Sequence, residues 1–394
     1  MRYNKLELEN ATHYSNNQLL INCTKQIDKL IKNKLCIMKQ IFTIILLLIY
    51  TVTFSQTKNT EGYDWPYKMP IWGKKAAAKG YKIQLPYGLN VNYVYNRMDL
   101  EITRFNMLIG DDPNSKLNQL ITKYVTLDNL HFNKTIAKAN GMNLRADVWV
   151  LPFWNIYGIY SNNQGSTEVS LEPRWYNKDG NLVLSVPNVY SKVNFSSNSY
   201  GIGSTIVTPI YKTLFFSLDG NTTWSHSDLL TKRVVFGVIS TRLGNRIRFN
   251  NGMMIALYIG AMYRGFLDHQ NNNGSILMQK AMPNLSNKVT TAINQQIQAN
   301  NDEIDQLDPN NPKDKIQIII LQNKNNSLKE IRTAFNSLME SQVNYSIRKD
   351  IINHWSVNFG FNYEINPELT FRGEFGKGSG NDFVLIGLQY RFGF

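Results

Sequence analysis

The chain has 394 residues, a hydrophobic fraction of 43% and a formal net charge of +13. Its mean hydropathy of −0.31 excludes a bundle of membrane-spanning helices, because each helical span needs about 20 consecutive apolar residues. The basic residues are scattered and form no tract. We therefore expect anionic lipid head groups or small solutes as partners, and no nucleic acid.

One short apolar run, residues 41–52, follows Lys39 near the start of the chain. A charged start, an apolar core of about a dozen residues and a small-residue exit are typical of a secretory signal peptide. We expect residues 38–56 to be this signal peptide, and residues 1–37 to be a leader from an over-extended gene model. A single anchoring helix is the alternative.

The chain expected after cleavage contains no cysteine, since Cys23 and Cys36 both precede the apolar run. This excludes disulfide and thiol chemistry there. In the N-terminal segment, residues 57–86, the stretch 57–82 holds two prolines and two tryptophans, which argues against a regular strand. A short helix around Ala76–Ala78 could either plug a lumen or lie at a membrane interface, and we favour the interface.

Strand alternation begins at Tyr87 and is clearest at the end of the chain. Successive side chains of a strand point to opposite faces, so each strand here has an apolar face and a small or polar face. This pattern is typical of strands with lipid on one side and a wet lumen on the other. In the last segment the apolar positions are Val384, Ile386, Leu388, Tyr390, Phe392 and Phe394, separated by Gly387, Gln389, Arg391 and Gly393.

These strands predict an all-β fold, a transmembrane antiparallel up-and-down β-barrel of about 12 strands, with a range of 10–14, over residues 87–394. A lipid-exposed sheet must close, because open edges cannot be satisfied in hydrocarbon. A soluble β-sandwich is the alternative. The prediction separates strands at 87–96 and 98–108, and places connections at Thr208–Ile210 and Gly244–Arg246.

Residues 268–350 lack strand alternation and are predicted to be a helical loop insertion. Val289, Ile293 and Ile297 recur every four residues, which indicates one helix. A second helix is predicted to begin at the capping box Ser327–Glu330. An acidic turn would join the two helices, and the insertion would lie outside the cell, where long loops of such barrels occur.

Several stretches resemble an uncharacterised family of outer-membrane β-barrel proteins from Gram-negative bacteria. They include LPYGLNVNYVYN at 85–96, RADVWVLPFWNIYGIY at 145–160 and IALYIGAMYRG at 255–265. The ending FSQ of the signal peptide resembles Bacteroidetes exports, and a strand ending in Tyr390, Phe392 and Phe394 resembles the barrel-assembly signal of outer-membrane proteins. The resemblance implies fold, location in the cell outer membrane, and the barrel-assembly machinery and lipopolysaccharide as partners. It implies no catalytic residue.

Charged residues on the polar faces of strands are the main candidates for function. In a lumen they could set solute selectivity, or they could pair across strands and fill a closed lumen. We expect a narrow path and a passive, porin-like channel for small solutes, anionic or zwitterionic. The predicted lumen residues are Arg145, Asp147, Arg372, Glu374 and Arg391.

The alternatives are a lipid-modifying enzyme of the lipase or lipid A deacylase type, and a structural or adhesive barrel that acts through its helical loop. For an enzyme, the testable pair is His354 and Ser356, although catalysis also needs an orienting group and an oxyanion stabiliser. His226 and Asp228, together with a neighbouring serine, have the composition of a Ser–His–Asp triad. Because these residues are consecutive in the sequence and triads converge in space, we expect a polar hairpin tip instead. No metal-ligand spacing or cofactor motif occurs, so we expect neither metal nor cofactor.

Overall fold

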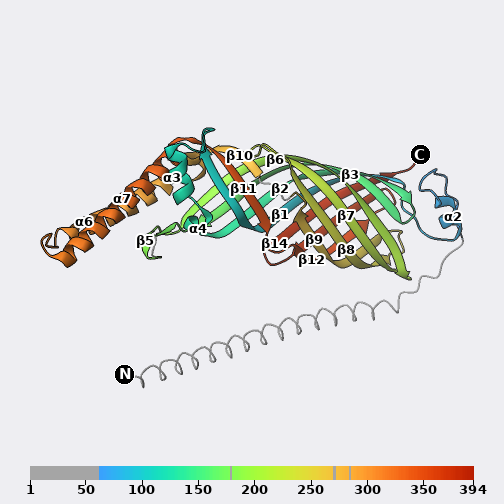
Figure 1. The fold of residues 1–394 in the computed structure, drawn as a ribbon. Helices are drawn as coiled ribbons and strands as arrows, with labels where there is room; N and C mark the ends of the chain where they lie inside the picture. The colour runs from blue at the N-terminus through green and yellow to red at the C-terminus, as the bar shows by residue number, and fades with distance from the viewer. Residues whose placement is uncertain (1–61, 178–179, 269–271, 284) are drawn as a thin grey trace, which may run out of the picture. The chain divides into compact units, whose positions relative to one another are not determined.

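The computed structural model describes residues 62–177, 180–268, 272–283 and 285–394, and the predicted leader and signal peptide lie outside them. Within that part of the chain, ten strands form a closed antiparallel barrel (Figure 1). The barrel closes because the first strand pairs with both the second and the last. In chain order the strands are β1 (Tyr87–Ile109), β2 (Phe132–Leu151), β3 (Trp154–Leu171), β6 (Val189–Tyr211), β7 (Leu214–Ser227), β8 (Val234–Arg248), β9 (Met254–Phe266), β12 (Trp355–Glu364), β13 (Leu369–Lys377) and β14 (Asn381–Phe392).

The all-β, closed and antiparallel prediction is confirmed, but the barrel has ten strands, at the low end of the predicted range. The count of 12 was too high because long strands were divided. β1 is one strand of 23 residues, with an irregularity between Ile102 and Arg104 that shifts its alternation. β3 likewise continues without a break through the polar stretch at 161–168, where the alternation weakens.

Two further strands lie outside the closed barrel, β10 (Asn272–Leu277) and β11 (Gln342–Ile351). They pair with each other, and β11 also pairs with the second half of β1, from Leu100 to Ile109. β14 pairs with the first half of β1 and ends its pairing at Met98. β11 therefore takes over the edge of β1 where β14 stops. The prediction that residues 268–350 contain no strand was wrong at both ends of that segment.

The helices between β10 and β11 are α5 (Met278–Ala281), α6 (Leu285–Ile304) and α7 (Pro312–Glu340). The predicted apolar stripe of α6 is confirmed, since Val289 and Ile293 are buried. The predicted start of the second helix was wrong. α7 begins at Pro312, and it is preceded by the N-cap Asn311, whose side chain accepts from the backbone N–H of Lys313. None of the described helices is both long and apolar enough to cross a membrane.

The barrel has two unlike ends (Figure 1). At the terminal end, where β1 begins and β14 ends, short turns join β2 to β3, β6 to β7 and β8 to β9. At the helical end, β1 leads into α3 (Lys116–Tyr124) and α4 (Leu127–Leu130), and β3 leads into the hairpin of β4 (Arg174–Tyr176) and β5 (Leu182–Ser185). α5, α6 and α7 lie at this same end.

The main apolar core lies at the helical end, not inside the barrel. Helix α7 contributes Phe335, which is 2% exposed and meets the ring of Trp175 edge-on at 5.5 Å. Leu171, where β3 ends, and Val189, where β6 begins, belong to the same core. Along the rest of the barrel the pattern is inverted. Large apolar side chains such as Leu89, Ile202 and Phe359 are about half exposed on the outer face, and the buried positions are mostly polar.

The segment before β1 lies at the terminal end. It carries α2 (Gly73–Ala78), and the backbone N–H of Ile71 donates to the carbonyl oxygen of Val150 at the end of β2. The ammonium group of Lys82 pairs with Glu364 on β12 at 2.9 Å. Side chains of the segment line the end of the barrel cavity.

Candidate site in the barrel lumen

A cavity of about 1520 Å³ runs inside the barrel from the N-terminal segment toward the helical end. Its wall is formed by inward-facing residues of the strands, because alternate residues of each strand point inward. Basic residues outnumber acidic residues in this wall. In mid-lumen, three groups of charged side chains are centred on Asp147, Asp219 and Glu374.

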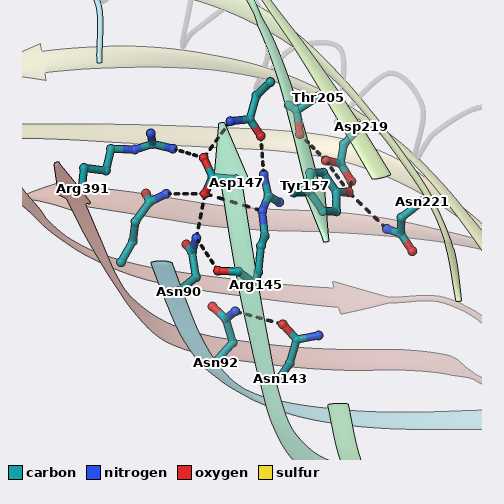
Figure 2. A network of polar contacts seen from close by, with 12 residues as sticks. Asn90, Asn92, Asn143, Arg145, Asp147, Tyr157, Thr205, Asp219, Asn221 and Arg391 are labelled. Carbon is teal, nitrogen blue, oxygen red and sulfur yellow. Dashed lines mark hydrogen bonds and ion pairs between the residues drawn. The ribbon is translucent and has the colours of Figure 1, made fainter. Parts of the chain in front are cut away.

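Asp147 on β2 is the centre of the first group (Figure 2). Its carboxylate accepts from Arg391 of β14 at 2.7 Å, from Asn155 at 2.7 Å and from Asn90 at 2.9 Å. Arg145 lies 4.0 Å away, at the limit of an ion pair. The Asp147 side chain is fully buried, and three donors satisfy its oxygens, as a buried carboxylate requires.

Glu374 on β13 is the centre of the second group. The guanidinium of Arg242 on β8 makes a bidentate contact with Glu374 and donates to both carboxylate oxygens, at 3.2 and 3.1 Å. The hydroxyl of Tyr258 donates to Glu374 at 3.1 Å, and Arg372 lies 3.8 Å away. Since β9 and β12 lie between β8 and β13, the Arg242–Glu374 pair bridges across part of the lumen.

Asp219 on β7 is the centre of the third group. It accepts from the hydroxyl of Tyr157 on β3 at 3.0 Å and from Thr205 on β6. The guanidinium carbon of Arg145 lies 3.5 Å from the centre of the Tyr157 ring, which is a close cation–π contact (Figure 2). Arg145 thus lies between the first and third groups.

The structure places all five predicted lumen residues on the inner face of the barrel, but it divides their roles. Asp147, Glu374 and Arg391 are buried and tightly paired. Arg145 and Arg372 have only long ion-pair contacts, and the Nε atom of each has no hydrogen-bond partner among the described residues. Of the five predicted residues, these two arginines have the charge that is least compensated by a neighbour.

Sequence reasoning missed Arg246 and Arg248 because it ended the strand at Leu243 and took Gly244 as a turn, and it did not single out Arg242, which lay inside the predicted strand. β8 in fact continues to Arg248. Gly244 is required inside the strand, since an added Cβ would lie 2.5 Å from the ring of Phe215. The spacing of the arginines at even positions was the signal available, because it places all three on one face of a strand.

The structure does not bring His354 and Ser356 together as a catalytic pair. The Nδ1 atom of His354 lies 2.9 Å from the carbonyl oxygen of Arg264, and its ring stacks on Tyr263 at 5.1 Å. The hydroxyl of Ser356 is buried, and it contacts no hydrogen-bond partner within the described part of the chain. An orienting carboxylate, Asp350, is 3.9 Å from His354 Nε2, but no contact links the imidazole to the serine.

The other polar candidates have local structural partners. His226 stacks on Tyr200 at 6.1 Å, and Asp228 accepts from the backbone N–H of Ser196 at 3.1 Å. In the ranges that the structure describes, no three His, Cys, Asp or Glu side chains gather as metal ligands. At the terminal end, Tyr390, Phe392 and Phe394 stack in sequence, and Tyr87 stacks on Phe394 at 4.5 Å.

No family model and no curated protein sequence matches the chain. Among solved structures it is similar to the β domain of the autotransporter BrkA from Bordetella, with 9% identity, a TM-score of 0.33, and coverage of 78% of this chain and 100% of that chain. It is also similar to the toluene transporter TbuX from Ralstonia pickettii, with 8% identity, a TM-score of 0.27, and coverage of 85% and 99%.

A third similar structure is the translocator domain of the autotransporter NalP from Neisseria meningitidis, with 7% identity, a TM-score of 0.29, and coverage of 81% and 93%. TM-scores this low do not define the class of the protein. The strand pairing defines the class: a closed ten-stranded antiparallel β-barrel with an apolar outer face and a polar interior.

Proposed function

We propose that the protein is an outer-membrane β-barrel that passes small anionic or zwitterionic solutes by diffusion through its lumen. The observation that carries the proposal is a cavity of about 1520 Å³ inside a barrel whose outer face is apolar, with many polar side chains and more basic than acidic residues among those that line the cavity. Such an outer face suits lipid, and a charged interior suits water and solutes.

The proposed orientation follows from the connections. Short turns lie at the terminal end and long helical connections lie at the other end, which is the arrangement of outer-membrane barrels with a periplasmic terminal end. Export would use the signal peptide at 38–56. The aromatic strand end at Tyr390, Phe392 and Phe394 would be presented to the barrel-assembly machinery, and lipopolysaccharide would surround the outer face.

Within the lumen, we assign selectivity chiefly to Arg145 and Arg372. The tight pairs of Asp147 with Arg391 and of Glu374 with Arg242 would act as fixed walls, because each pair has little net charge. Solutes would meet these two arginines, whose charge is only partly compensated, on their way through the cavity.

The test is single-channel conductance of the mature protein, purified from the outer membrane of an expressing host and inserted in a planar bilayer. We expect stable ohmic conductance steps, and a reversal potential in a KCl gradient that shows selectivity for anions. A folded barrel that gives no steps would eliminate the channel. Recovery of the protein outside the outer-membrane fraction would eliminate the proposed location.

A structural or adhesive role is the second candidate, and one observation favours it. The near half of the α6–α7 hairpin is anchored in the apolar core that it shares with the ends of β3 and β6, so the hairpin is held as an extension of the barrel. Under this candidate, removing residues 297–322 at the far end of the hairpin would abolish adhesion while leaving conductance unchanged. Loss of conductance without loss of adhesion would exclude it.

A further inference from the structure

A set of basic side chains lies at the terminal end of the cavity, away from the charged groups in mid-lumen. Five basic side chains line the cavity there: Lys75, Lys79, Lys212, Arg246 and Arg248. None of the five makes an ion pair within the described ranges of the chain. We call these five residues the basic vestibule.

The vestibule is assembled from three segments that are distant in sequence. Lys75 lies in α2 and Lys79 is the residue that caps its end. Lys212 lies in the turn between β6 and β7, and Arg246 and Arg248 point inward at the end of β8. The turn and the strand are adjacent, since the backbone N–H of Arg246 donates to the carbonyl oxygen of Thr213 at 3.0 Å.

Aromatic rings position two of these cations. The guanidinium carbon of Arg246 lies 4.9 Å from the centre of the Phe215 ring, and the ammonium nitrogen of Lys212 lies 5.0 Å from the Tyr211 ring. Cation–π contacts hold a side chain in place without neutralising its charge. Both groups therefore remain able to bind an anion.

Among the residues that the structure describes, one carboxylate lines this part of the cavity, and it is already engaged. Glu364 at the end of β12 accepts from Lys82 at 2.9 Å and fixes the N-terminal segment to the barrel. This pair fixes the residue that follows α2 by four positions to the end of β12, which is separated from β8 only by β9. Like charges that line one cavity repel one another, and a bound anion relieves the repulsion.

We infer that the basic vestibule is a binding site for small, multiply charged anions, formed jointly by the N-terminal segment and the barrel wall. Phosphorylated and polycarboxylated solutes share the chemistry that five cations recognise. The inference rests on the proposed lumen function and deepens it, because it gives the N-terminal segment a part in binding solutes where the cavity opens.

Titration calorimetry of the full mature protein in detergent at low salt tests the site, with inorganic pyrophosphate and citrate as separate probes. K75Q/K79Q is the main variant, because both lysines are exposed and their replacement should leave the fold intact. K68Q/K74Q is the matched control, since it removes the same charge from the same segment at exposed positions that do not line the cavity.

The expected result is saturable binding of at least one probe, weakened about fivefold in K75Q/K79Q and unchanged in K68Q/K74Q. The wall variant R246Q/R248Q should weaken binding by at least as much. Equal affinity in all three variants and the wild type, or no binding of either probe, would overturn the site. A loss in K75Q/K79Q with no loss in R246Q/R248Q would overturn its shared construction.

The same protein in planar bilayers separates this inference from the proposed function. A barrel that conducts but binds neither probe would refute the vestibule and retain the channel. A barrel that gives no conductance, yet binds pyrophosphate in a manner that depends on Lys75 and Lys79, would refute the channel and retain the vestibule.

Discussion

The two ends of the barrel use the same strands with opposite interiors. On β3, the inward positions Asn155 and Tyr157 face the polar lumen, whereas Val169 and Leu171 at the other end of the strand are buried in the apolar core. No turn or break separates the two regions. A strand pattern therefore fixes which side chains point inward, but the partners across the interior decide whether those side chains should be polar or apolar.

This difference teaches that the two regions are held by different forces. The helical end is stabilised by packing of side chains such as Phe335, which is non-directional and scales with buried apolar area. The lumen is held by the inter-strand ladders and by a few buried, charge-assisted hydrogen bonds, which are directional and costly to leave half-made. Substitutions in the two regions should accordingly have separable effects.

The largest effect is expected from Phe335→Ala. Truncating a fully packed phenylalanine should destabilise the helical end by about 3–5 kcal/mol, because it removes buried area and leaves a cavity against Trp175. Limited proteolysis should cut α6 and α7 faster, while the barrel keeps its heat-dependent shift on gels. Ile320→Ala, at an exposed position of α7, is the control. Simultaneous loss of the gel shift would show that the two regions are not independent.

A smaller but still large effect is expected from Asp147→Asn. Removing this buried carboxylate leaves Arg391 without its charge partner, and should lower the free energy of unfolding in urea by about 3 kcal/mol. Asp111→Asn, in an exposed loop, should change little. In the double variant with Arg391→Gln, the loss should be less than the sum of the single losses. Strict additivity would contradict a direct pair.

Charge reversal at Arg372 tests the lumen without removing a tight pair. Arg372→Glu should shift the anion-to-cation permeability ratio toward cations by roughly threefold or more, because the arginine faces the cavity and its charge is poorly compensated. Reversal potentials in a KCl gradient measure the ratio. Lys329→Glu, exposed on α7 and absent from the cavity wall, is the matched control. An unchanged ratio would remove Arg372 from the selectivity site.

The smallest effect concerns pH at the helical end. The hydroxyl of Tyr124, at 2.6 Å, and the ammonium of Lys123, at 3.0 Å, lower the pKa of Glu330 below its ordinary value of 4.5. A lowered carboxylate pKa contributes stability that is present above the ordinary pKa and lost as the pH falls through the lowered value.

Because Glu330 is half exposed, this contribution should be only about 0.5 kcal/mol. Protease resistance of the helical end, compared between pH 6 and pH 3, should fall less in Glu330→Gln than in the wild type. Glu340→Gln, at an exposed position of the same helix, should behave as the wild type. An identical pH response in all three proteins would show that the contact contributes nothing measurable.

The periodic part of the fold could be predicted from the sequence because it is local. Alternation identified the inner and outer faces, and it placed Arg145, Asp147, Arg372, Glu374 and Arg391 on the inner face, where the structure has them. Strand ends were less predictable, since Gly244 has the composition of a turn but is required by a neighbouring ring. The same lack of local signals hid the continuity of β1 through its irregularity.

The pairing inside the lumen could not be predicted from local pattern. Arg242 and Glu374 are separated by 132 residues, and no local feature of the sequence around either residue indicates that the two pair. The basic vestibule is equally non-local, because it requires the N-terminal segment to be fixed by the contact of Lys82 with Glu364, 282 residues further along. Which cations remain uncompensated depends on these distant contacts.

The pairing of β1 with β14 also has a consequence for the order of assembly. The carbonyl oxygen of Leu85 accepts from Arg391, a contact between residues 306 positions apart, and the seam beside it joins the first barrel strand to the last. Closing so long a loop is slow, because its entropy must be lost before the contacts form. β11 precedes β14 in the chain and can pair earlier with the second half of β1, from Leu100 to Ile109. The first half of this edge, from Tyr87 to Met98, stays unpaired until β14 is in place. During that interval the nascent sheet exposes a strand edge, the feature through which sheets aggregate.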